Sequence, residues 1–92
     1  MNITLDQVYK QNQDTAFREI EGLAYVVDPA TSDLHSFNEV ATRIWVSLDG
    51  QRTVSQVVDI VTGEFEVDRP RAESDTLELL AALSDKGLIV LV

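Results

Sequence analysis

The sequence predicts a small domain of the α+β class. Three short β-prone runs lie between residues 16 and 37, and three helical segments with capping signals follow between residues 38 and 87. Strands grouped ahead of helices favour an antiparallel sheet covered by helices over an alternating βαβ sheet. A length of 92 residues and a hydrophobic fraction of 45% suit a single core.

The β-prone runs predict a three-stranded antiparallel sheet. Residues 16–20 and 23–27 flank Glu21-Gly22, which favours a hairpin. Asp28-Pro29 begins a second turn, and residues 33–37 follow as a third strand beside the second.

The helical segments carry recognisable ends. Asn38 is a suitable N-cap for the first, Thr53 and Gln56 form a capping-box pattern for the second, and Pro70 suits the first turn of the third. Gly87 is a C-cap signal after the third. A three-helix unit with an attached hairpin is winged-helix-like, so we expect a three-stranded antiparallel sheet followed by a three-helix bundle.

The two ends of the chain differ in character. Residues 1–14 are polar without a sustained period, so we expect a weakly docked N-terminal tail and a single domain over residues 15–92. Residues 88–92 are too apolar for a free tail and predict a docked last strand or an oligomer contact. Met1 and the complete helical ending favour a free-standing protein.

Composition argues against several classes of function. Without cysteine and with His35 as the one histidine, no Cys or His metal site or thiolate nucleophile is expected, and no glycine-rich phosphate loop is present. We therefore expect no enzymatic activity, cofactor or metal. A net charge of -9 opposes nucleic-acid binding. No run reaches the length of a membrane span and the start is unlike a signal peptide, which favours the cytoplasm.

The residue pattern leaves binding as the expected role. The third strand has one edge without a predicted neighbour, and an extended peptide can add a strand to such an edge. A short strand of this kind is equally well explained as a blunted edge.

Read together, several motifs resemble the PqqD family over residues 23–88. They are the Phe37-Asn38 entry to the first helix, Trp45, Leu48-Asp49-Gly50 with Thr53-Val54, and Lys86-Gly87-Leu88. The resemblance implies a non-catalytic chaperone, also described as a RiPP recognition element. Such a protein binds the leader of a ribosomally made precursor peptide and presents it to a modifying enzyme, often a radical SAM enzyme.

The resemblance also implies a binding site, because in that family the leader lies antiparallel along the third strand, in a groove beside the third helix. The strand side would comprise Asp33, Leu34, His35, Ser36 and Phe37. The helix side would be drawn from Glu73, Asp75, Leu77, Glu78, Leu80, Ala81 and Ser84. His35 replaces a frequent aromatic residue, which predicts a more polar pocket.

Several of these residues also have structural explanations. Phe37 and Trp45 are expected to fill the core, as are Leu79 and Leu83, which share one helix face. Leu77, together with Ala81 and Ser84, fits groove and core equally well. Asp75 also fits a helix-dipole role near the start of the third helix.

Two further functions stay open from the sequence. A winged-helix nucleic-acid-binding regulator would use Arg43, Arg52, Arg69 and Arg71 and would bind DNA in a salt-dependent way. An oligomerising subunit would pair through the apolar residues 88–92, giving a homodimer by strand exchange.

Overall fold

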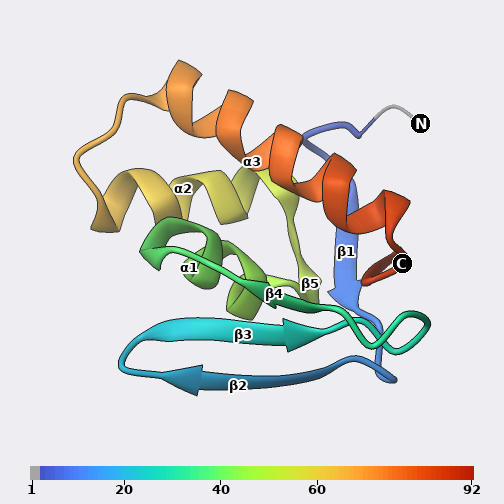
Figure 1. The fold of residues 1–92 in the computed structure, drawn as a ribbon. Helices are drawn as coiled ribbons and strands as arrows, with labels where there is room; N and C mark the ends of the chain where they lie inside the picture. The colour runs from blue at the N-terminus through green and yellow to red at the C-terminus, as the bar shows by residue number, and fades with distance from the viewer. Residues whose placement is uncertain (1–2) are drawn as a thin grey trace.

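The computed structural model describes residues 3–92 and confirms the α+β class, with the helices lying between and above two small antiparallel sheets (Figure 1). The sheets have the orders β2-β3-β4 and β5-β1-β6. In chain order the elements are β1 (Val8–Gln11), β2 (Ala16–Ile20), β3 (Leu23–Val27), β4 (Leu34–Ser36), α1 (Glu39–Ser47), β5 (Asp49–Thr53), α2 (Val54–Glu64), α3 (Arg69–Asp85) and β6 (Ile89–Leu91).

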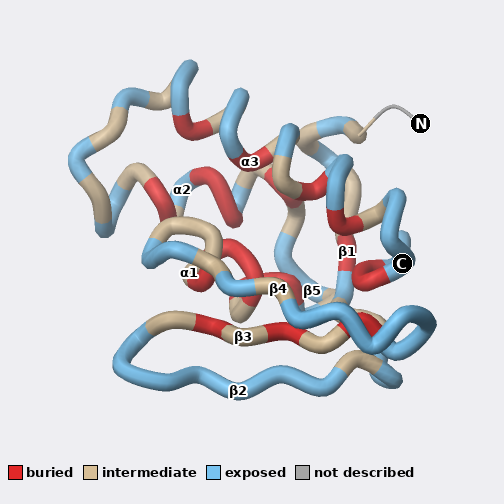
Figure 2. The backbone as a smooth tube through the Cα atoms, viewed as in Figure 1, coloured by how far each residue is buried: buried red, intermediate tan, exposed pale blue. Residues whose placement is uncertain are grey.

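The sheet β2-β3-β4 is the one that the sequence predicts. Glu21 and Gly22 both have positive φ, 53° and 81°, which is the two-residue hairpin geometry that matches the strand twist. Ala24 and Val26 on β3 are fully buried, and their neighbours in the strand are half-buried on the other face. Figure 2 shows β2 exposed along its length, whereas β3 alternates. One face of this sheet therefore covers the core and the other meets solvent.

The sheet β5-β1-β6 as a whole was not predicted and corrects the expectation of a weakly docked polar tail, whereas β6 confirms that residues 88–92 include a docked last strand. β1 lies within residues 1–14 and pairs with β5 on one side and β6 on the other. Tyr9 is only 1% exposed, and the Gln11 side chain donates to the Trp45 carbonyl at 2.8 Å. These partners are distant in sequence, so the local pattern of residues 1–14 carried no sign of them. Met1 and Asn2 lie outside the described residues.

The predicted helix ends are confirmed. Asn38 accepts from the Ala41 N–H at 2.8 Å, Thr53 and Gln56 form the capping box, and Asp68 caps α3 just ahead of Pro70. Past α3 the Leu88 N–H reaches the Leu83 carbonyl at 2.9 Å. Of the helices in residues 3–92, none is long and apolar enough to cross a membrane.

The two sheets and the helices share one core, with Trp45 of α1 among its largest fully buried side chains. The ring of Phe17 lies 5.6 Å from Trp45 at 84°, and that of Phe37 lies 5.9 Å away at 71°. Both are edge-to-face contacts, which aromatic rings favour. Trp45 therefore links β2 and the segment after β4 to α1. Its full burial confirms the expected core position.

Replacing Tyr9 tests whether β1 is part of the folded unit. We expect Tyr9→Ala to lower the free energy of unfolding by about 3 kcal/mol, because it empties a buried aromatic site. The measurement is urea denaturation followed by Trp45 fluorescence. Lys10→Ala, an exposed neighbour, is the matched control and should change stability by less than about 0.5 kcal/mol. Equal, small effects of both variants would contradict the role of β1.

Two glycines should respond to alanine in opposite directions. Gly63 lies inside α2, and a Cβ there meets nothing within 4 Å, so Gly63→Ala should stabilise by about 0.5–1 kcal/mol. Gly87 has a φ of +71°, so Gly87→Ala should destabilise by about 1–2 kcal/mol even though space is available. Thermal unfolding of the two variants would compare them, and a stabilised Gly87→Ala would refute the assignment of this helix end.

Candidate functional site: an open strand edge beside a groove

No strand among residues 3–92 pairs with the outer edge of β4, and the hydrogen bonds at the ends of β4 show which backbone groups face this open edge. The Asp28 N–H donates to the Asp33 carbonyl and the Phe37 N–H to the Ala24 carbonyl, both at 2.9 Å. In an antiparallel ladder the bonded pairs alternate, so His35 is bonded to Val26 of β3. The N–H and C=O groups of Leu34 and Ser36 therefore point away from β3.

Side chains alternate across the same strand. Leu34 and Ser36 pair with Val27 and Tyr25 on the solvent face, and Leu34 is 64% exposed. His35 pairs with the buried Val26 and so lies on the inner face. Its Nε2 atom is buried without a hydrogen-bond partner among residues 3–92. The open edge thus has one polar side chain on the core side that lacks a partner.

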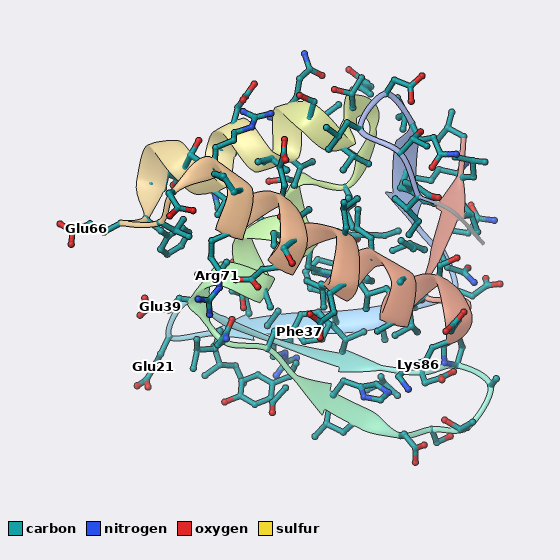
Figure 3. All side chains as sticks on the ribbon, turned by 90° about the horizontal axis from the view of Figure 1, so that it is seen from above. Glu21, Phe37, Glu39, Glu66, Arg71 and Lys86 are labelled. Atoms are coloured by element: carbon teal, nitrogen blue, oxygen red, sulfur yellow. The ribbon has the colours of Figure 1, made fainter. Side chains whose placement is uncertain are left out.

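A groove of about 440 Å³ begins where β4 ends and lies between α1 and α3. It is lined by Asn38, Val40, Ala41, Ile44, Asp75, Glu78, Leu79 and Ala82. The α3 residues have the spacing i, i+3, i+4 and i+7, which places them on one helix face. Asn38, two residues after the end of β4, is a lining residue, so the groove starts close to the end of the strand; Figure 3 shows Phe37, the residue between them, beside α3.

The structure brings together only part of the predicted site. Asp75 and Glu78 line this groove, which lies between α1 and α3 rather than along the strand, and their role in peptide binding stays a prediction. The strand residues Asp33, Leu34, His35, Ser36 and Phe37 do not line it, although Phe37 directly precedes the lining residue Asn38. Leu80 is 0% exposed in the core, so its place on the groove side is wrong in this structure.

The other helix residues have separate surroundings. Leu77 is half-buried against the core, Ala81 is exposed and Ser84 is half-buried. Glu73 pairs with Arg69 at 3.3 Å. None of these four lines the groove.

Sequence reasoning missed most of the groove's apolar lining. Val40, Ala41 and Ile44 come from α1, and Leu79, expected in the core, is half-buried, packs against the core and also lines the groove. The helical spacing that links Asp75, Glu78, Leu79 and Ala82 was the signal that could have found the α3 side.

Charge on the groove is negative. Arg71, one helical turn before Asp75, forms an ion pair with it at 3.2 Å. This ion pair is a more direct structural role for Asp75 than an interaction with the helix dipole. Glu78 has no ion-pair partner within the described part of the chain, and no Lys or Arg is among the lining residues. The groove is therefore an apolar channel with at least one uncompensated carboxylate.

The arginines expected for nucleic-acid binding are all engaged by carboxylates. Arg43 pairs with Glu64 at 2.6 Å, Arg52 with Asp49 at 2.9 Å, and Arg69 with both Asp59 and Glu73. Asp59 and Glu73 raise the pKa of Arg69, and backbone N–H groups of Arg52 and Gln51 hold the pKa of Asp49 below its usual value. Paired arginines offer little net positive charge to a phosphate backbone.

No group of three or more His, Asp or Glu side chains in residues 3–92 is arranged to hold a metal ion. An open strand edge beside an apolar groove is instead the arrangement that peptide-binding domains use for strand addition.

Comparison with known proteins identifies the family. The model of the family described as "Coenzyme PQQ synthesis protein D (PqqD)" matches residues 24–89, and the chain belongs to this family. A search of curated protein sequences gives no match.

Three solved structures are similar to the chain. TbiB1 in complex with the TbiA(beta) leader peptide is 28% identical, with a TM-score of 0.79 over 87% of this chain and 93% of that one. The lasso peptide synthetase B1 complexed with its leader peptide is 21% identical, with a TM-score of 0.77 over 89% and 96%. The PqqD part of Methylobacterium extorquens PqqCD, a stand-alone RiPP recognition element, is 22% identical, with a TM-score of 0.78 over 97% and 95%.

Proposed function

We propose that this protein binds the leader of a ribosomally synthesised precursor peptide by strand addition and presents it to a modifying enzyme. The observation that carries the proposal is the open edge of β4 beside the groove between α1 and α3. The family and the leader-bound state of the similar TbiB1 support it.

The open backbone groups set the geometry of binding. A leader strand antiparallel to β4 would form its hydrogen bonds with Leu34 and Ser36, the two residues whose N–H and C=O groups face outward. The leader residue opposite His35 would then point to the inner face, where Nε2 of His35 lacks a partner. Shifting the register by one residue would turn every leader side chain to the other face.

The remaining roles follow from the same proposal. The domain acts without catalysis in the cytoplasm, and the chemistry belongs to a partner such as a radical SAM enzyme. β6 is an edge strand with Val90, Leu91 and Val92 exposed by 38%, 52% and 66%, which supports pairing with a second copy as a route to a homodimer.

An NMR titration of the nitrogen-labelled protein tests the proposal. Leader segments of the precursor peptides encoded beside its gene are added in turn. We expect saturable shifts of the β4 amides and of the groove face of α3 with one of them. Shifts confined to α2, or no saturable binding by any segment while the fold stays intact, would refute the proposal.

A proline on the edge of β4 tests whether the leader binds through backbone hydrogen bonds of strand addition or only through side-chain contacts. Ser36→Pro removes an N–H that faces the open edge and leaves the β3 ladder intact, since edge strands accept such a proline. We expect the variant to fold and its affinity for the leader to fall about tenfold or more. Ser36→Ala keeps the N–H and should bind like the wild type in isothermal titration calorimetry. Normal binding by a folded Ser36→Pro would exclude this edge.

A further inference from the structure

We propose that the groove between α1 and α3 selects a leader with a Lys or Arg residue, whose cationic end lies beside Glu78 and Asp75. This inference rests on the proposed function and adds the chemistry of the leader. The position concerned is the leader residue that comes opposite Phe37 in the antiparallel pairing, two residues before the one opposite His35.

The register brings that residue to the groove. Positions two apart on a strand lie on the same face, so the leader residues opposite His35 and Phe37 both point inward. Phe37 directly precedes Asn38, the first lining residue. Figure 3 shows Phe37 beside α3, and Phe37 packs partly buried against the core, so we place the opposing leader side chain on the α3 side.

The lining fits a side chain with an apolar stem and a charged end. Val40, Ala41, Ile44 and Leu79 provide apolar walls, and the polar atoms near them belong to Asn38, Asp75 and Glu78. Lys and Arg bury their methylene stems along apolar surface and keep the charged group at the rim. A Leu would fill the walls but would form no ion pair with the exposed Glu78, which has none within residues 3–92.

The charges around the groove disfavour a leader Glu or Asp at this position. Arg71 already contacts Asp75, and in the part of the chain that the structure describes no Lys or Arg is among the lining residues. A leader Glu or Asp at this position would meet the carboxylate of Glu78 and an Asp75 that is already paired with Arg71, in a chain whose net charge is -9. The groove thus favours a cation on both local and long-range grounds.

A charge exchange between protein and leader tests this inference. Two probes are compared: the leader segment that saturates the wild-type protein in the NMR titration, and the same segment with its Lys or Arg at the groove position changed to Glu. We expect Glu78→Gln to weaken binding of the unchanged leader about two- to fivefold, and Glu78→Lys to weaken it about tenfold at low salt. The Glu-containing leader should bind Glu78→Lys better than it binds the wild type.

Glu66→Lys is the matched control. Glu66 is exposed at the connection of α2 and α3 and projects away from the molecule in Figure 3, so this variant alters net charge equally without touching the groove. It should change affinity by less than about twofold.

The outcomes separate the inference from the proposed function. A leader that binds along β4 but carries neither Lys nor Arg at this position, or whose affinity changes equally in Glu78→Lys and Glu66→Lys, overturns the charge selection alone. A protein that binds no leader overturns the proposed function as well. Rescue of the Glu-containing leader by Glu78→Lys supports both.

Discussion

The packing of Trp45 is the contact on which the site depends. Its ring is fully buried and meets Phe17 from β2 and Phe37 from the segment between β4 and α1. Because Phe37 follows β4 directly, this contact fixes the open edge relative to α1. α1 in turn provides one wall of the groove, so the same contact sets the position of the groove relative to the edge of β4.

Features encoded by neighbouring residues could be predicted from the sequence. The hairpin depends on Glu21-Gly22, and the helix ends depend on Asn38, Thr53 and Asp68, each of which bonds backbone three residues away. Such contacts leave a local signature. β1 has none, because its partners are β5 and β6, and its four residues include only two strongly apolar ones. The pairing of β1 with β5 and β6 could therefore be found only from the structure.

The groove was predicted only in part for a different reason. α3 is apolar on more than one side, since it packs against α2, α1 and β6. A rotation of one residue, about 100°, decides whether Leu79 or Leu80 enters the core, and leucines at both positions give no preference. The structure buries Leu80 fully, whereas Leu79 lies at the margin of the core and also lines the groove. Asp75 and Glu78 lie outside the core, as charged side chains without a buried partner generally do.

The shortness of β4 has a consequence for the lifetime of the complex. With three residues, of which two face outward, the strand offers four backbone groups to a guest chain. Each such hydrogen bond contributes only about 1 kcal/mol net, so the backbone alone cannot hold a peptide for long. A guest therefore dissociates quickly unless its side chains match the groove. The side chains of the guest, more than its backbone, would therefore decide which peptide stays bound long enough to be passed on.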